Sequence, residues 1–452
     1  MQKLVSKFGL AAHLALLTVA PLVFSTTTVL CLAALGLVWL VMEPPRLGRE
    51  GLSAARHRVL VAMLKDPVFW FTLALAVYQL IVAVNNGVQM VYSPEQDKWY
   101  ISGAISLLPA SSGDVGMPLF SALTAMIVVL QGCRHALGKS GRQVYLIIAA
   151  TLSGIAALVE ATLAQMFGGE LMELTHCALH TPFYVGAAHG VLLIEAISIL
   201  STVLEETRFK VLIFLLIALG GNLAGLFIFS PTPVFAVYVA AALIAATYAM
   251  IHLYITSGSA MGLVYFIFLV VSITAAAMSA GSVMDASQVM ERLNALAEFK
   301  LLPDGFTGAR HALSSLSFGI WKESPWIGCG QGAFPLKLAF TATESDWALF
   351  SSLQTAPFNG GWLMLAERGV VGAFVFACPL CCLVFTYFRR AFGALRLGMP
   401  APVTIAGIVA LCAVVFESAF DGSYLLPGLP VALLSLLAVA ASSFAKENKK
   451  NG

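Results

Sequence analysis

The sequence predicts an all-α, polytopic membrane protein with about twelve transmembrane helices. Of its 452 residues, 59% are hydrophobic and only 11% are charged, whereas soluble domains carry roughly 25% charged residues. Apolar runs long enough to cross a bilayer, roughly 17 to 25 residues each, also recur along the chain. We expect spans at 8–23, 24–42, 68–85, 115–133, 144–165, 184–204, 211–229, 234–254, 261–280, 360–385, 401–420 and 427–445.

The basic residues agree with this span count and indicate an orientation. Twelve spans put both termini on one side, and that side has eighteen Lys and Arg residues against six on the other. Because cytoplasmic loops are enriched in basic residues, we expect both termini in the cytoplasm of a bacterial inner membrane. No cleaved signal peptide is expected, since no A-x-A-like site follows Phe24 and a second apolar run starts at once. A net charge of +2 gives no reason to expect a nucleic-acid partner.

These spans divide the chain into three parts. Residues 1–280 hold spans one to nine, 281–359 form a periplasmic loop region, and 360–452 hold spans ten to twelve with a cytoplasmic tail. A connection as long as 281–359 is expected to fold onto the outer face instead of staying structureless. Apolar residues at helical spacing predict two amphipathic helices in it, at 285–300 and about 307–322, lying at the membrane interface.

Two shorter outer loops are expected at 86–114 and 166–183. The second contains His176 and His180, most simply as part of an ordinary polar loop. A role as general base stays open for them, because histidine titrates near neutral pH. Two histidines alone do not make a metal site, so no metal is expected.

The eight cysteines do not form a disulfide framework. Five lie in or beside predicted spans, where cysteine acts as a small apolar residue: Cys31, Cys378, Cys381, Cys382 and Cys412. Cys177 and Cys329 both fall on the predicted outer side, and whether they pair is left open by their spacing.

The densest motif follows the second loop helix. Arg310 precedes Pro325 by fifteen residues, and a glycine-rich turn containing Gly328 and Gly330 comes next. Glycine allows a backbone to approach a ligand closely. By itself, Arg310 would be an ordinary headgroup-facing arginine on an interfacial helix, with His311 as its exposed neighbour.

A second motif lies where span ten begins. Asn359 is followed after nine residues by a Gly-x-x-Gly that starts at Gly369, with Glu367 two residues before it. Together with Arg310 and the glycine-rich turn, this pattern resembles the O-antigen ligase and O-antigen polymerase superfamily, over about 300–445. Ligases of that family carry His-Asn where this chain has Phe358-Asn359.

The resemblance implies a membrane glycosyltransferase, either ligase or polymerase. It would transfer a glycan from an undecaprenyl-diphosphate carrier in the membrane lipid to a hydroxyl of another glycan chain, lipid A core or a protein. Arg310 would hold the diphosphate, because guanidinium binds phosphate oxygens through two donors. Gly328 and Gly330 would add backbone N–H donors. No metal or other cofactor is needed for this chemistry.

The general base is not identified by the resemblance, because Phe358 replaces the histidine. Glu367 and His311 are the candidate bases, and Asn359, His176, His180 and Arg368 are candidate substrate-binding residues. Intramembrane charges such as Glu367 and Arg368 are costly, so they indicate a polar cavity or an ion pair. Candidate partners for Arg368 in such a pair are Glu417 and Glu195.

Two other functions stay open. A lipid-linked glycan transporter or flippase also has about a dozen spans with buried charges. Such transporters carry internal repeats and short loops, whereas this chain has a long outer loop and no evident repeat. A catalytically inactive glycolipid-binding relative is also compatible with Phe358.

Overall fold

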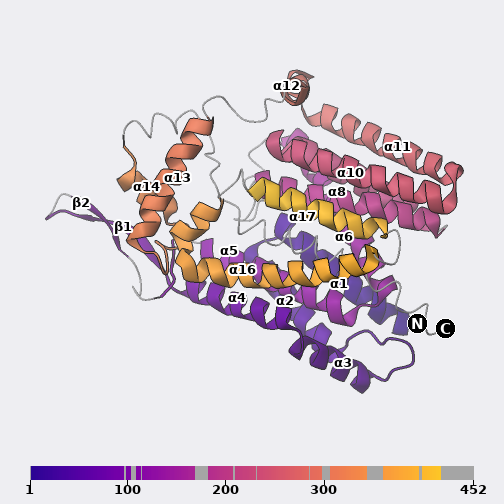
Figure 1. Ribbon diagram of the computed structural model, residues 1–452, viewed down its shortest axis with the longest axis horizontal. Coiled ribbons are helices and arrows are strands. Elements are labelled where there is room, and N and C mark those ends of the chain that lie inside the picture. The colour runs from indigo at the N-terminus through magenta and orange to yellow at the C-terminus, as the bar shows by residue number, and fades with distance from the viewer. Residues whose placement is uncertain are drawn as a thin grey trace.

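The computed structural model describes residues 2–95, 98–102, 108–112, 115–167, 182–206, 209–230, 232–284, 286–297, 306–343, 360–395 and 400–418. They form an elongated bundle of long helices, with a small sheet and the helices of residues 306–341 at one end (Figure 1). The helices are α1 (Gln2–Val23), α2 (Thr26–Met42), α3 (Leu52–Leu64), α4 (Pro67–Val84), α5 (Gly116–Gln131), α6 (Lys139–Phe167), α8 (Pro182–Glu205), α9 (Leu212–Phe229), α10 (Thr232–Ser257), α11 (Ser259–Val283), α12 (Ala286–Ala297), α13 (Phe306–Glu323), α14 (Phe334–Thr341), α16 (Gly360–Leu395) and α17 (Pro402–Ser418).

Within the part of the chain that the structure describes, eight helices are long and apolar enough to cross a membrane. Three shorter apolar helices, Phe8–Val23, Thr26–Met42 and Pro402–Glu417, accompany them. Every predicted span from 8–23 to 401–420 overlaps one of these helices, and 427–445 lies outside the described residues. The prediction of a helical, multi-pass membrane protein is confirmed, while the count of twelve and the orientation stay predictions.

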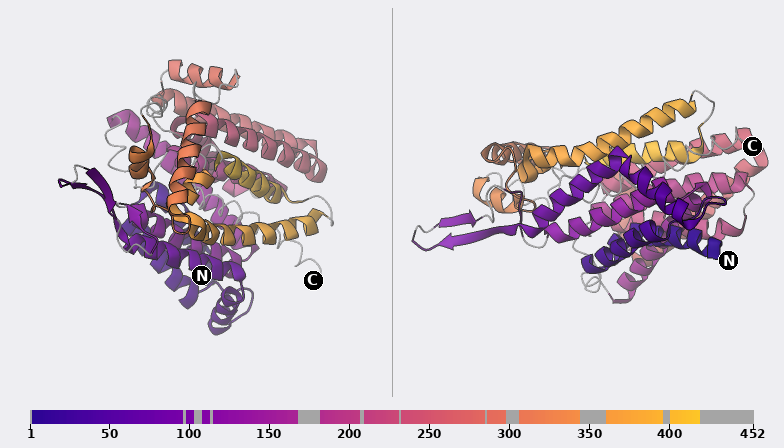
Figure 2. Two further views of the ribbon diagram at one scale, coloured as in Figure 1. Left: turned by 60° about the vertical axis from the view of Figure 1, so that its left-hand side comes forward. Right: turned by 90° about the horizontal axis from the view of Figure 1, so that it is seen from below.

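Helix α8 is the central helix of the bundle. Every residue from Val185 to Leu200 is buried, because α6, α9, α10 and α17 pack around α8. Small residues let these helices approach closely: a Cβ on Gly221 of α9 would overlap the backbone of Gly154 on α6. Helix α16 packs along α4. The helix that follows it in the chain, α17, packs against α8 and α10 (Figure 2).

A hydrogen-bonded polar cluster joins α6, α8 and α9 inside the bundle. The hydroxyl of Ser153 donates to Oδ1 of Asn222 (2.7 Å). Nδ1 of His189 lies 3.0 Å from the Ser153 hydroxyl oxygen and 3.0 Å from Oδ1 of Asn222. The amide nitrogen of Asn222 donates to two backbone carbonyls, those of Ala150 and Ala218. These bonds satisfy buried polar groups and fix the three helices relative to one another.

Segment 86–114, which we expected to be a loop, contains a three-stranded sheet. The strands are β1 (Asn86–Ser93), β2 (Lys98–Ser102) and β3 (Ser111–Ser112). β1 pairs antiparallel with β2 and parallel with β3. The β1–β2 ribbon projects beyond the ends of the helices (Figure 2). The two-residue alternation of Val88, Met90 and Tyr92 was the local signal for a strand.

Both helices predicted for the long loop are present. α12 covers most of 285–300, and α13 matches 307–322 closely. On α12, the guanidinium of Arg292 donates to the backbone carbonyl of Phe227 and lies 5.6 Å from the centroid of its ring. The third loop helix, α14, was not predicted, and the interfacial position of α12 and α13 stays a prediction.

The end of the bundle opposite the sheet is held by a charged cluster around Asp66. This carboxylate caps α4 by accepting from the N–H of Val68 (3.1 Å). It also pairs with Arg134 through two bonds of 3.0 and 3.1 Å, and lies 3.0 Å from Nε2 of His135. Burial alone would raise the pKa of Asp66, but the bond to His135 and the charge of Arg134 outweigh it and hold the pKa below its usual value.

We predict that Asp66→Asn lowers the free energy of unfolding by about 3 kcal/mol, because it leaves Arg134 largely buried and unpaired. The measurement is denaturant unfolding of the detergent-solubilised protein. Lys139→Ala is the matched control: its pair with Glu206 spans 3.8 Å and is solvent-exposed, so we expect a loss under about 0.5 kcal/mol.

The pH dependence follows from the lowered pKa. The contribution of Asp66 is complete above its unfolded pKa of about 4 and is lost as pH falls through the lower folded value. The stability gap between wild type and Asp66→Asn should therefore hold from pH 7 to about pH 4 and narrow below it. A gap that closes near neutral pH would contradict this assignment.

Candidate functional site

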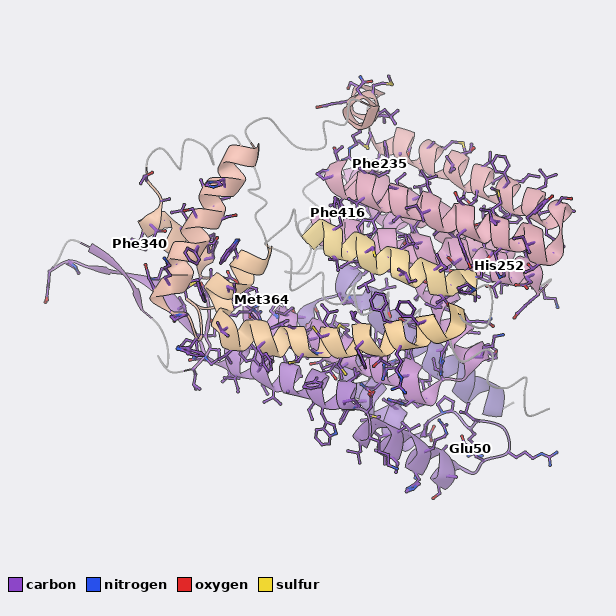
Figure 3. All side chains as sticks on the ribbon, viewed as in Figure 1. Glu50, Phe235, His252, Phe340, Met364 and Phe416 are labelled. Atoms are coloured by element: carbon purple, nitrogen blue, oxygen red, sulfur yellow. The ribbon has the colours of Figure 1, made fainter. Side chains whose placement is uncertain are left out.

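The glycine-rich turn at 328–332 lies directly against the first turns of α16. Met364 marks this part of α16 in Figure 3, with Phe340 of α14 in the same end of the molecule. Two backbone hydrogen bonds join the turn to α16, Cys329 N to Ala366 O (2.8 Å) and Gly330 N to Glu367 O (2.9 Å). Two more join α16 to the residues just before the turn, Val370 N to Pro325 O (2.9 Å) and Val371 N to Trp326 O (3.1 Å). Two motifs singled out in the sequence therefore meet in space.

A break in α16 makes this contact possible. Gly369 has φ 62° and ψ −169°, a conformation that side-chain-bearing residues rarely adopt. In an unbroken helix, the N–H groups of Val370 and Val371 would bond to the carbonyls of Ala366 and Glu367. Here all four groups bond to residues 325–330 instead, so two helical bonds are exchanged for four tertiary ones.

The turn needs glycine for the same contact. Gly328 and Gly330 have φ 72° and φ 105°. A Cβ on Gly328 would overlap the backbone of Glu367, and one on Gly369 would overlap the carbonyl of Trp326. The other side of the turn is held by the sheet, because Gln331 donates to Ala110 O (2.8 Å) and accepts from Ser112 N (2.8 Å).

One expected role of the turn is wrong in this conformation. The N–H of Gly328 donates to Ser324 O (2.9 Å) and that of Gly330 donates to Glu367 O (2.9 Å). Because both groups are already bonded within the protein, neither is open to a diphosphate. The two glycines support the site by letting α16 and the turn touch.

Glu367 faces the turn and the start of α14. Glu367 is 6% exposed, and its carboxylate accepts from the N–H group of Phe334 (3.4 Å). Phe334 opens α14, so the carboxylate lies at a helix N-terminus, which favours negative charge. Nearby, burial and the Glu367 carboxylate raise the pKa of the Cys329 thiol well above its usual value, which makes it a poor nucleophile.

Arg368, the next residue, faces α4. It is 2% exposed, its Nη1 donates to Oε1 of Gln79 (3.2 Å), and its guanidinium carbon lies 4.2 Å from the ring centroid of Phe376. Gln79 in turn donates to Oε1 of Gln331 (2.8 Å). Arg368, Gln79 and Gln331 therefore link α16, α4 and the turn through one chain of hydrogen bonds.

The ion pair considered for Arg368 is not formed. Glu417 accepts from the hydroxyl of Tyr238 (2.8 Å), and both carboxylate oxygens of Glu195 lack a partner. The reason is packing: Glu417 and Glu195 lie on α17 and α8, whereas Arg368 faces α4. Sequence reasoning also missed Gln79, although a glutamine inside an apolar span was a usable signal.

The remaining predicted residues are described in part or not at all. His311 is exposed on α13. Arg310 lies in the second turn of α13, but its side chain is outside the described part of the chain, as are Asn359, His176 and His180. Cys177 is also outside it, and Cys329 has a free thiol.

Helix α13 is nonetheless anchored against the start of α16. Leu313, one helical turn after Arg310, belongs to a buried cluster with Leu363 and Ala366 of α16. The backbone at Arg310 is thereby carried by a helix that packs beside the glycine-rich turn. Among the residues that the structure describes, no group of three His, Cys, Asp or Glu side chains is arranged to hold a metal.

We predict that Gly328→Ala and Gly369→Ala each lower the free energy of unfolding by about 2 kcal/mol or more, because each combines a positive φ with backbone overlap. Denaturant unfolding in detergent measures this. Gly319→Ala on α13 is the matched control, since a Cβ there meets nothing within 4 Å. It should be neutral or stabilise by about 0.5 kcal/mol; equal stability of Gly369→Ala and Gly319→Ala would show that the break does not need glycine.

Two comparisons with known proteins found no relative that would identify this site. No protein-family model matches the chain, and no curated protein matches it. The proposed function therefore rests on the glycine-rich turn, the break in α16 and the two charged residues beside that break.

Proposed function

We propose that the protein is a membrane glycosyltransferase of the O-antigen ligase or polymerase type. It transfers a glycan from an undecaprenyl-diphosphate carrier to an acceptor hydroxyl at the periplasmic face. One observation carries the proposal: the glycine-rich turn and the break at Gly369, two motifs far apart in sequence, hydrogen-bond to each other. That contact fixes a carboxylate and a guanidinium on adjacent residues, Glu367 and Arg368, which are the charged residues of the candidate span Gly361–Thr386.

The proposed reaction needs a proton acceptor and a cation. The acceptor hydroxyl attacks the anomeric carbon of the donor sugar, and the bond from that carbon to the diphosphate oxygen breaks. The diphosphate leaves with the bonding electrons, and Glu367 takes the proton of the hydroxyl. Arg310 stabilises the negative charge that develops on the leaving group.

The first functional prediction concerns Arg310. Arg310→Ala and Arg310→Lys should each lower glycan transfer at least about 100-fold while membrane insertion is kept, because lysine retains the charge but loses the two-donor contact. The assay is transfer of a lipid-linked glycan in membrane vesicles. Arg292→Lys on α12 is the control and should transfer normally. Full activity in both Arg310 variants would contradict the proposed role of Arg310 in holding the diphosphate.

The second functional prediction concerns the base. Glu367→Gln should lower transfer by about 10²- to 10⁴-fold with little change in stability, because an amide oxygen still accepts from Phe334 N. Glu195→Gln is the matched control, since Glu195 is also a buried carboxyl within an apolar helix but lies on α8. Equal losses in the two variants would exclude Glu367 as the base.

Transport of a lipid-linked glycan has one observation in its favour. Glu195 is 1% exposed and neither of its carboxylate oxygens has a partner, and unpaired acids inside a membrane often line transport pathways. Vesicles separate the two functions. Movement of a labelled glycolipid between leaflets without transfer to any acceptor would favour a transporter, and binding with neither would favour an inactive relative.

A further inference from the structure

Arg368, Tyr78, Gln79 and Gln331 form a buried polar cluster where α16, α4 and the glycine-rich turn meet. This cluster has more hydrogen-bond donors than acceptors. Four of its polar atoms have no partner: Nε and Nη2 of Arg368, Nε2 of Gln331 and the hydroxyl of Tyr78. All three residues are less than one-tenth exposed. The nearby side-chain oxygens are already used, because Oε1 of Gln79 accepts from Arg368 and Oε1 of Gln331 accepts from Gln79.

These unpartnered groups lie close together. A Cβ added at Gly372 would lie 2.5 Å from the Tyr78 hydroxyl oxygen and 2.4 Å from Cβ of Arg368, so the two side chains start from the same place. Both also contact Phe376: the Tyr78 ring packs edge-on at 6.3 Å between centroids, and the Arg368 guanidinium lies over the ring. Gln331 is joined to Arg368 through Gln79.

Among the residues that the structure describes, the guanidinium of Arg368 has no ion-pair partner in direct contact, although the neighbouring Glu367 carboxylate attracts it at longer range. That carboxylate is bonded to the start of α14. A buried cation without a counter-charge in direct contact is destabilising. Such a group is retained where function needs it, at the expense of stability.

From this geometry we propose that Arg368, Tyr78 and Gln331 form a binding site for phosphate oxygens. Nε and Nη2 lie along one edge of the guanidinium, the edge that binds two oxygens of one anion side-on. Tyr78 and Gln331 supply further donors from other directions, which suits a tetrahedral, acceptor-only phosphate. This deepens the proposed function and rests on it in one respect: the phosphate is then that of the lipid carrier.

Thermal unfolding of the full-length protein in detergent tests the site. Inorganic pyrophosphate at about 100 times its Kd should raise the wild-type Tm by about 4 °C relative to sodium chloride of equal ionic strength. Arg368→Gln should abolish this rise, and Tyr78→Phe should weaken the affinity about tenfold. Tyr265→Phe is the control and should respond as wild type does, because the Tyr265 hydroxyl donates to Ile197 O at a different place.

A second variant separates binding from folding. Arg368→Met removes a buried charge that has no direct ion-pair partner and keeps an apolar chain, so its Tm without pyrophosphate should equal or exceed that of wild type. A Tm several degrees lower, or a pyrophosphate response that survives in Arg368→Gln, would overturn the proposal. If the Tm of the wild type responds to none of the phosphate probes, the proposal is also overturned. The unpartnered donors would then be hydrogen-bonded to water.

The source of the phosphate and the proposed function are tested in the same preparation. Nanodiscs that contain a polyprenyl phosphate, compared with phosphatidylglycerol alone, supply the lipid probe. A rise with that probe only, abolished in Arg368→Gln, supports a site that takes lipid-borne phosphate. Glycan transfer without any phosphate response would overturn this site alone, and a phosphate response without transfer to any acceptor would overturn the proposed function alone.

Discussion

The positive φ of Gly369 takes two hydrogen bonds out of α16 and turns four backbone groups toward residues 325–330, which include the start of the glycine-rich turn. Buried backbone groups must be bonded, and in a membrane-spanning helix water is not a ready substitute. The turn and α16 therefore stabilise each other, since each supplies hydrogen-bond partners that the other would lack. The sheet, α13 and α14 pack on this junction, so these elements lie together at one end of the bundle.

Two charges that are adjacent in sequence lie just before this break and point in different directions, because successive residues of a helix are turned by about 100°. Glu367 accepts from the backbone at the start of α14, and Arg368 reaches α4 through Gln79. The two charges attract each other but do not form a hydrogen-bonded ion pair, and each has different hydrogen-bond partners. A carboxylate beside backbone donors is suited to take a proton, and an arginine with a free edge is suited to bind an anion.

Polar clusters elsewhere in the bundle differ from this one in a specific way. Asp66 has both oxygens bonded to Arg134 and His135, and Asn222 bonds to Ser153 and two backbone carbonyls. Those clusters satisfy their members and hold helices together. Around Arg368, donors are left over, and Glu195 also lacks partners. The contrast between satisfied and unsatisfied buried groups separates structural polar residues from candidates for binding.

The sequence by itself determined the class of protein, the positions of its apolar helices and the two loop helices, because apolar length and helical spacing are local properties. It also pointed to Gly328, Gly330, Glu367 and Arg368, since glycine runs and intramembrane charges are unusual. Only the tertiary structure decided that the turn bonds to the break at Gly369, that its N–H groups are occupied and that Arg368 faces Gln79 rather than Glu417. Hydrogen-bond partners depend on which distant segments pack together, and no local pattern in the chain encodes that.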